Sequence, residues 1–521
     1  MAAGFHIENF GCRAARSDGE AIGERLLALG HCVEQLPAAE VVIVNTCSVT
    51  AEADREARAF IRRAHRRNPG ARIVVTGCYA QRAPEELAGL PGVAAVVGNS
   101  HKALVPGIVN QQANESAGQQ ASKSASQQAG ESASQRVSEA ASQQVGGAAD
   151  RAFVDVRALA NGVVAGAAPV WVDDRFAHSF LEEAQVAPGA QTRPNLKIQE
   201  GCGNRCTFCV IPQTRGGSRS LDAEKVLGQV RGFVAAGGKE LVLSGINLGR
   251  WGRDLAMTAA ADPTHAGNYP GMDGAQLIAN GADGSERMTL AGMVRRIFAQ
   301  TELRRLRLSS IEPMDWDAEL MGLMREFGGG RLARHAHLPL QSGSDTVLRR
   351  MHRRYRPWHY AAKVAELFEA AGPDLTLGAD VMAGFPGETE REFRESCEFI
   401  RGLPFGYLHL FPFSPRPGTA GWRLHAEQPV AREAVEERMA ELGRIREEKM
   451  RAHRSAFVGR MVECLTLKTP EAMRREGWSA ALTENFLPVR VAGSVGSNRM
   501  VRVRVNGMRA DGELDGMVVE A

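Results

Sequence analysis

A cysteine triplet on one short segment constrains this chain more than any other feature. Cys202, Cys206 and Cys209 stand in the run EGCGNRCTFC with the spacing Cys-x3-Cys-x2-Cys. Three thiolates this close can hold three corners of a cubane iron-sulfur cluster and leave its fourth iron open. An open iron can chelate the amino and carboxylate groups of S-adenosylmethionine, whose reductive cleavage gives a carbon radical. Zinc is the alternative, but it usually takes four ligands in paired units. The spacing therefore favours a radical-generating cluster.

Composition sets wide limits on the rest. A chain of 521 residues exceeds one core, so two to four domains are expected. The formal charge of +3, from 63 basic and 60 acidic residues, neither requires nor excludes a nucleic-acid partner. The N-terminus MAAGFHIENFGC has no basic region followed by an apolar stretch, and no apolar segment approaches the roughly 20 residues of a membrane helix. With an odd number of cysteines, nine, these features predict a cytoplasmic protein with no membrane segment.

Two low-complexity stretches divide the chain. A Gln, Ser and Ala-rich run begins near residue 110 and predicts a disordered linker, and a Gly, Ala and Asp-rich stretch at 256–287 predicts a solvent loop. The expected organisation is α/β. It comprises a small parallel α/β domain at 1–109, a linker and connector at 110–187, a partial (β/α)6 barrel at 188–430 with an insert near 256–287, a connecting helix at 431–455, and a small β-barrel at 456–521.

Three more cysteines follow predicted strands of the first domain. GFHIENFG leads to Cys12, AEVVIVNT to Cys47 and ARIVVTG to Cys78. Continuous apolar runs such as VVIV suit parallel strands covered on both faces, and the carboxyl ends of such strands meet at one sheet edge. Three buried core cysteines are the alternative. Gly11 and Gly77, directly before two of them, permit close backbone approach and favour a second metal site. Cys32, Cys397 and Cys464 lack this placement and are predicted to be packing residues.

The third region alternates six strand-like segments with helices, which predicts an incomplete barrel with its active site at the carboxyl ends of the strands. The cysteine triplet follows the first strand. Polar residues recur after later strands: Ser244, Asn247, Ser309, Ser310, Glu312, Gln341, Ser342 and Asp380, with Gly384 nearby. Of these, Ser310, Glu312 and Gln341 are candidate cofactor contacts, although Glu312 has helix capping as an equal alternative. His335 and His337 face one side of a strand, but a packed or hydrogen-bonded role is expected for both.

The last region has short strand signals separated by Gly, Asn and Asp turns, typical of a small closed β-barrel. Such barrels often bind RNA. Arg490, Arg499, Arg502 and Arg504 are candidate phosphate contacts and Phe486 a candidate stacking face, with a solvated charged surface as the alternative.

Taken in order, these parts resemble the radical S-adenosylmethionine methylthiotransferases. The resemblance rests on the two cysteine sets, AGGKELVLSGINLG, HLPLQSGSDTVLRRMHRRY and GFPGETEREF, and it covers nearly all of the chain outside the two low-complexity stretches. It implies two [4Fe-4S] clusters, an auxiliary one on Cys12, Cys47 and Cys78 and a radical-generating one on Cys202, Cys206 and Cys209. It also implies a TRAM domain at the C-terminus and S-adenosylmethionine contacts at Gly237, Gly238 and Glu240. One departure is GCRAARSDGEA, which lacks the asparagine that usually follows the first cysteine.

The resemblance also implies an activity and its partners. The enzyme would add a methylthio group to carbon 2 of N6-threonylcarbamoyladenosine at position 37 of a tRNA anticodon loop, with an electron donor such as flavodoxin or ferredoxin and a sulfur donor. RLSSIEP, SGINLGRWG and FPFSPRPGTA favour this branch. Isopentenyladenosine of tRNA and an aspartate of a ribosomal protein are alternative substrates. An RNA-binding protein with structural clusters is an alternative of another class.

Overall fold

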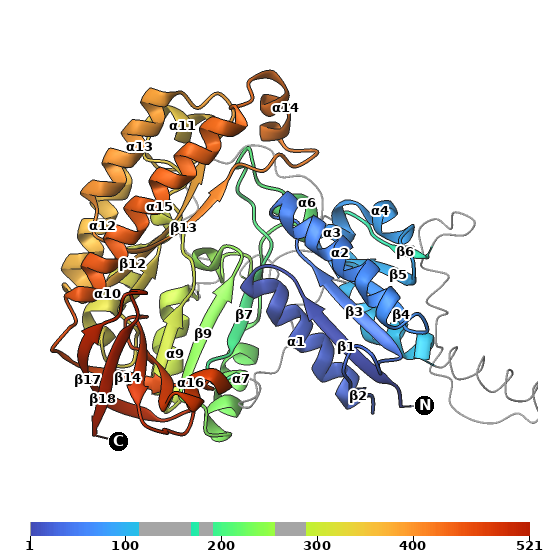
Figure 1. The fold of residues 1–521 in the computed structure, drawn as a ribbon, viewed down its shortest axis with the longest axis horizontal. Helices are drawn as coiled ribbons and strands as arrows, with labels where there is room; N and C mark the ends of the chain where they lie inside the picture. The colour runs from blue at the N-terminus through green and yellow to red at the C-terminus, as the bar shows by residue number, and fades with distance from the viewer. Residues whose placement is uncertain (1, 114–167, 177–190, 256–287, 521) are drawn as a thin grey trace, which may run out of the picture. The chain divides into compact units, whose positions relative to one another are not determined.

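The computed structural model describes residues 2–113, 168–176, 191–255 and 288–520. The chain forms two compact units, divided near Phe180 (Figure 1). The greater part of the expected linker and the whole insert near 256–287 lie outside the described residues.

The first unit is built on a parallel sheet with the strand order β2-β1-β3-β4-β5-β6. Its strands are β1 (Gly4–Asn9), β2 (Cys32–Val33), β3 (Val41–Thr46), β4 (Arg72–Gly77), β5 (Val93–Gly98) and β6 (Val170–Trp171). Its helices include α1 (Arg13–Ala28), α2 (Ala51–Arg67), α3 (Cys78–Arg82) and α4 (Pro84–Ala88). Every residue of β3 is buried, as the continuous apolar run VVIV predicts for a strand covered on both faces.

Helix α2 shows how the sequence sets an element here. Thr50 caps the helix by accepting a hydrogen bond from the backbone N of Ala53 at 3.2 Å, and acidic residues occupy the first turn. Phe60 and Ile61 lie on the buried face of the helix, and basic residues fill its last turn. Two stretches assigned to the linker belong to this unit instead. Residues 110–113 continue a helix that begins at residue 105, and Val170–Trp171 extend the sheet next to β5, because apolar side chains of both stretches are buried in its core.

The second unit contains the partial barrel. Its parallel strands are β7 (Asn195–Glu200), β9 (Glu240–Gly245), β10 (Arg305–Leu308), β11 (His335–His337), β12 (Thr376–Ala383) and β13 (Phe405–Pro412). Single bridges such as Ser310 to His337 connect the β10 side to β11. A short strand, β8 (Arg219–Ser220), pairs antiparallel with β7. The predicted six-unit partial barrel is therefore confirmed.

The helices of this unit alternate with the strands. They are α6 (Ile211–Arg215), α7 (Ala223–Ala235), α9 (Leu290–Gln300), α10 (Ala318–Phe327), α11 (Asp345–Arg350), α12 (Pro357–Ala371), α13 (Glu390–Gly402) and α14 (Ala420–Glu427). The segment Asp345–Ala371 contains two helices, α11 and α12, and Pro357 stands in the first turn of α12, where its missing backbone N–H is not needed. The long charged helix α15 (Arg432–Ser455) follows as predicted.

A closed five-stranded barrel ends the chain, with the order β14-β15-β16-β18-β17. The strands are β14 (Met461–Thr466), β15 (Trp478–Thr483), β16 (Pro488–Ala492), β17 (Met500–Met508) and β18 (Leu514–Glu520), and α16 (Glu471–Arg475) precedes β15. Strand β15, WSAALT, is hard to predict from the sequence, because its small residues weaken the alternation of apolar and polar side chains. This closed barrel contacts the amino ends of the (β/α) strands, where Arg307 on β10 donates to the carbonyl of Glu484 at 3.0 Å.

Candidate functional site

The loop that carries Cys202, Cys206 and Cys209 follows β7 directly. Gly201 turns the chain with φ +69°, and a Cβ built on it would lie 1.9 Å from the carbonyl oxygen of Gly217. Only glycine fits this turn. The backbone N of Cys202 then donates to the carbonyl of Gly216 at 3.0 Å, and the backbone N of Thr207 donates to the carbonyl of Met351 at 3.2 Å. The loop is therefore fixed at both ends by residues distant in sequence.

All three cysteines of this loop line one cavity of about 350 Å³. The other lining residues are Gly203, Asn204, Arg205, Thr207, Pro212, Gln213, His352, Gly418, Thr419 and Ala420. Burial raises the pKa of the Cys202 thiol, and it raises the pKa of Cys209 to about 12. When a metal binds, thiols of this kind lose their protons and coordinate the metal as thiolates. The cavity and its three sulfurs fit a cluster with three protein ligands.

Hydrogen-bond donors surround the sulfur atoms. The backbone N of Asn204 lies 3.4 Å from Sγ of Cys202, and Nδ2 of Asn247 lies 3.6 Å from the same sulfur. Nη1 of Arg353 donates to Sγ of Cys206 at 3.2 Å. Donors in these positions stabilise negative charge on cluster sulfur and influence its reduction potential.

Glu312 is connected to this loop through Arg353. Its Oε2 accepts from Nη2 of Arg353 at 2.5 Å, and it makes no side-chain cap to the helical turn that it precedes. The capping alternative is therefore wrong. Arg353 was not predicted from the sequence, where it is one of several arginines in LRRMHRRYR. It is buried, and its charge is balanced by Glu312.

The interpretation of Gly237, Gly238 and Glu240 as cofactor contacts is corrected by the structure. They lie at or before the amino end of β9, whereas the cysteine loop follows the carboxyl end of β7, which is parallel to β9. Glu240 is fully buried and forms ion pairs with arginines at 3.1 to 3.4 Å. These arginines are Arg193, Arg305 and Arg307. Burial alone would raise the pKa of Glu240, but the guanidinium groups hold it below its usual value.

The other polar residues after the strands have mixed roles. Ser244 donates to the carbonyl of Leu196 at 3.4 Å, and the hydroxyl of Ser342 bonds that of Ser396 at 2.9 Å, so both stabilise the fold. Ser309 is buried within the barrel. Ser310 lies just beyond β10, bridged to His337. Gln341 has a left-handed φ of +66° and a buried Oε1 with no hydrogen-bond partner, which is typical of a functional position.

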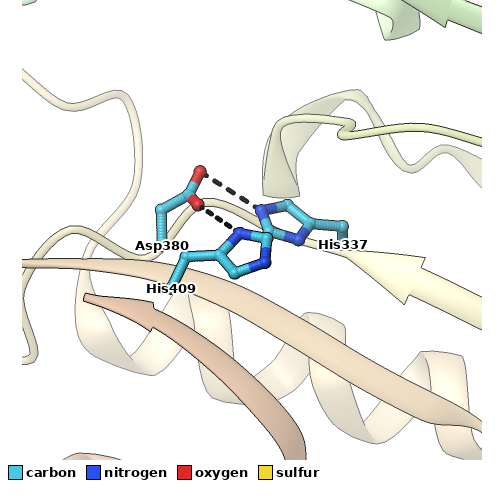
Figure 2. A group of neighbouring side chains, drawn as sticks. All are labelled: His337, Asp380 and His409. Carbon is cyan, nitrogen blue, oxygen red and sulfur yellow. Dashed lines mark hydrogen bonds and ion pairs between the residues drawn. The ribbon is translucent and has the colours of Figure 1, made fainter. Parts of the chain in front are cut away.

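The strand histidines are hydrogen-bonded, as expected. Nε2 of His335 lies 2.8 Å and Nδ1 of His337 lies 3.0 Å from the hydroxyl of Tyr407. Asp380 is ion-paired with His337 and His409 (Figure 2). Gly384, with φ +75°, donates its backbone N to Glu388 at 2.8 Å beyond the carboxyl end of β12.

In the first unit, the structure gathers Cys12, Cys47 and Cys78. A hydrogen bond with Cys12, burial and charge interactions with Cys12 and Cys78 raise the pKa of Cys47. A Cβ at Gly11, where φ is +96°, would lie 2.4 Å from Sγ of Cys47, so glycine permits this approach. Nδ2 of Asn99 donates to Sγ of Cys78 at 3.3 Å. This trio fits a second cluster with three thiolate ligands.

Ala15 occupies the position of the missing asparagine. Its carbonyl oxygen accepts from Nδ2 of Asn45 at 2.5 Å, and the same amide nitrogen donates to Asn9 at 3.0 Å. An asparagine from β3 therefore holds the first turn of α1, the helix that follows Cys12. The remaining cysteines follow the packing prediction in part. Cys397 and Cys464 are buried, but Cys32 is exposed, because it lies on the short edge strand β2.

Comparisons with known proteins agree with this geometry. Residues 4–98 match the family model described as Uncharacterized protein family UPF0004, and residues 196–400 match the Radical SAM superfamily. Threonylcarbamoyladenosine tRNA methylthiotransferase MtaB of Bacillus subtilis is 30% identical over 505 residues, which are 96% of this chain and 93% of the relative. The chain belongs to the radical S-adenosylmethionine methylthiotransferase family. It is a radical S-adenosylmethionine enzyme.

Two further relatives show that members of the family are named for different modified nucleosides of tRNA. The MtaB of Aquifex aeolicus is 29% identical over 96% of this chain and 99% of its own length. A tRNA-2-methylthio-N(6)-dimethylallyladenosine synthase from Erythrobacter litoralis is 28% identical over 89% of this chain and 86% of its own length. The cofactors of this enzyme are S-adenosylmethionine and [4Fe-4S] clusters. Among the described residues, none of the helices combines the length and hydropathy needed to cross a bilayer.

Proposed function

We propose that this enzyme transfers a methylthio group to carbon 2 of N6-threonylcarbamoyladenosine at position 37 of tRNA. The observation that carries the proposal is the similarity to MtaB proteins, which extends over 96% of the chain for three of them. Dimethylallyladenosine synthases match at similar identity, and one of them covers the same 96% of the chain, so isopentenyladenosine is the second candidate substrate.

Carbon 2 of adenine is neither acidic nor electrophilic enough for ordinary acid-base substitution. The cluster on Cys202, Cys206 and Cys209, when bound, supplies the electron that cleaves S-adenosylmethionine to a radical able to activate this carbon. The chain itself holds that chemistry in place. Arg353 and Asn247 orient and stabilise the sulfur ligands, and Glu312 fixes Arg353.

We assign the auxiliary cluster to Cys12, Cys47 and Cys78, and further cofactor contacts to Ser310, Glu312 and Gln341. For Gln341 the support is its unpartnered Oε1, and for Glu312 it is the link through Arg353 to Cys206. A flavodoxin or ferredoxin class of electron donor and a separate sulfur donor would complete the reaction, in the cytoplasm.

The adenine must leave the anticodon stack to react, which costs little in a single-stranded loop. Arg499, Arg502 and Arg504, exposed near or on β17, are proposed phosphate contacts. Arg490 is paired with Glu513 at 2.5 Å and only 19% exposed, whereas Arg502, although paired with Glu520 at 3.1 Å, is 58% exposed; Arg490 is therefore less suited to this role. Phe486 does not provide a stacking face for RNA, because its ring packs on His335 and Tyr407 and lies under the guanidinium groups of Arg193 and Arg307.

Mass spectrometry of tRNA nucleosides tests the substrate. A deletion strain is expected to lose 2-methylthio-N6-threonylcarbamoyladenosine and to regain it with the wild-type gene, but not with a Cys202→Ala gene. Loss of the isopentenyl nucleoside instead would assign the second candidate. Unchanged tRNA nucleosides would overturn both and direct attention to a ribosomal-protein aspartate. The RNA-binding alternative would be supported by purified protein that forms no 5'-deoxyadenosine with S-adenosylmethionine and a reductant.

A further inference from the structure

Three metal-binding side chains converge from three neighbouring strands of the partial barrel. His337 lies on β11, Asp380 on β12 and His409 on β13, and one ligand atom of each lies within 4.8 Å of the other two. Figure 2 shows the carboxylate of Asp380 facing both imidazole rings. We propose that this cluster binds one divalent cation of the zinc class, in addition to the two iron-sulfur clusters. None of the three residues has a part in the function proposed above.

The spacing of the ligand atoms fits a coordination sphere. Nε2 of His337 lies 3.2 Å from Oδ2 of Asp380, and Nδ1 of His409 lies 3.3 Å from Oδ1. With metal bonds of about 2.1 Å, tetrahedral ligand atoms are separated by about 3.4 Å. Two of the three pairs therefore already have the required separation. The third needs only a rotation of His409, whose side chain is 61% exposed.

Tyr407 positions the buried ligand. Its hydroxyl lies 3.0 Å from Nδ1 of His337 and 2.8 Å from Nε2 of His335. The hydroxyl oxygen can accept from Nδ1–H of His337 while its proton is donated to His335. His337 then presents the lone pair of Nε2 to Asp380, as a metal-bound histidine does. Metal-binding histidines usually have their second ring nitrogen held by a hydrogen bond of this kind.

The charges of the cluster also favour a cation. In the part of the chain that the structure describes, the ion pairs of Asp380 are with His337 and His409 alone. A histidine is charged only when it is protonated, so neither partner supplies a permanent positive charge. The carboxylate is only partly exposed, and a divalent cation between the three groups would neutralise it.

The ligand set indicates which cation fits. Two imidazole nitrogens and one carboxylate oxygen suit zinc and similar borderline ions, whereas calcium and magnesium prefer oxygen ligands alone. Three protein ligands leave a fourth position for water or an oxygen atom of a bound molecule. Because the side chain of His409 is exposed, an ion can reach the cluster from solvent at this ligand.

Metal analysis of the reconstituted holoenzyme tests this site. Protein carrying its full iron content is incubated anaerobically with zinc sulfate, desalted, and analysed for zinc and iron. The wild type is expected to retain one zinc ion per chain. Because loss of an outer-shell contact alone weakens metal sites 10–100-fold, His409→Ala and Asp380→Asn are expected to weaken zinc binding by at least about 100-fold. Zinc should also raise the melting temperature of the wild type and not of His409→Ala.

The matched control is His359→Ala, which removes an exposed imidazole from α12 and should leave zinc retention unchanged. Equal iron content in all four proteins shows that the variants are folded and that zinc has not entered the cysteine sites. Failure of the wild type to retain zinc would overturn the proposal and leave a hydrogen-bonded His-Asp-His group. Equal zinc retention in His409→Ala, Asp380→Asn and the wild type would overturn it as well. Neither result depends on which tRNA base is modified.

Discussion

Nη1 of Arg353 donates a hydrogen bond to Sγ of Cys206 at 3.2 Å, while Nη2 of the same guanidinium binds Glu312 at 2.5 Å. Burial alone would lower the pKa of Arg353, yet the charges of Tyr355, Glu312 and Cys206 raise it well above its usual value. A permanent positive charge therefore lies against the sulfur of Cys206, one cysteine of the triplet. Arg353 thereby links Glu312, which follows β10, to Cys206 in the loop that follows β7.

Substituting Arg353 is expected to lower the reduction potential of the radical cluster. A hydrogen bond to a charged group contributes about 1.5–3 kcal/mol, so Arg353→Met should shift the potential by roughly 60 mV or more to the negative side. Formation of 5'-deoxyadenosine should slow accordingly. Electron paramagnetic resonance titration measures the potential. Arg349→Ala, an exposed arginine paired only locally with Asp345, serves as the control. An unchanged potential in Arg353→Met would show that this contact has no electronic role.

Glu240 is expected to stabilise the fold and not to bind the cofactor. Truncation to alanine leaves the fully buried Arg307 without a carboxylate partner, which costs about 3–5 kcal/mol. Glu240→Ala should therefore lower the urea midpoint strongly, while Glu302→Gln, at an exposed position nearby, should not. Folded Glu240→Ala should bind S-adenosylmethionine with unchanged affinity. A selective loss of that affinity would restore the interpretation that the sequence motif suggested.

The wild type and Glu392→Gln should differ in stability by an amount that depends on pH. Burial would raise the pKa of Glu392, but hydrogen bonds from Arg350, Thr346 and the backbone of Thr389 lower it to about 2. The contribution of the ionised Glu392 carboxylate to the free energy of unfolding is complete above its ordinary pKa of 4.5. This contribution is lost as the pH falls towards 2. The urea midpoint of wild type should exceed that of Glu392→Gln at pH 7, and the gap should narrow at pH 3. Exposed Glu390→Gln should show little effect at either pH.

A substitution at Gly201 tests the turn that positions the loop carrying Cys202, Cys206 and Cys209. In Gly201→Ala the new Cβ collides with the carbonyl of Gly217, and the positive φ adds about 1–2 kcal/mol of strain. The variant should retain roughly half of its iron, since only one of two clusters is disturbed. Gly228→Ala on α7 is the control, because a Cβ there meets no atom within 4 Å and the residue does not line the cavity. Equal iron in the two variants would mean that the loop tolerates the altered turn.

The sequence predicts most of this fold because its signals are local. The buried strand at Val41–Thr46, the capped helix α2 and the cysteine spacing at 202–209 each follow from residues close together in the chain. The gathering of Cys12, Cys47 and Cys78 is also predictable, since parallel strands end at a common edge.

The errors concern contacts between distant residues. Arg353 reaches Cys206 across 147 positions, and no local pattern separates it from the other arginines of its segment. Glu240 was misplaced because a motif resemblance does not reveal at which end of a strand a residue lies. Phe486 likewise packs on His335, which belongs to another part of the second unit.

The central claim is that six cysteines form two separate cluster sites, and iron content tests it most directly. Anaerobically reconstituted wild type should contain about eight iron atoms per chain, four for each cubane. The triple variant lacking Cys12, Cys47 and Cys78 should contain about four, and so should the one lacking Cys202, Cys206 and Cys209. A wild type with about four irons, or either triple variant with about eight, would contradict the account.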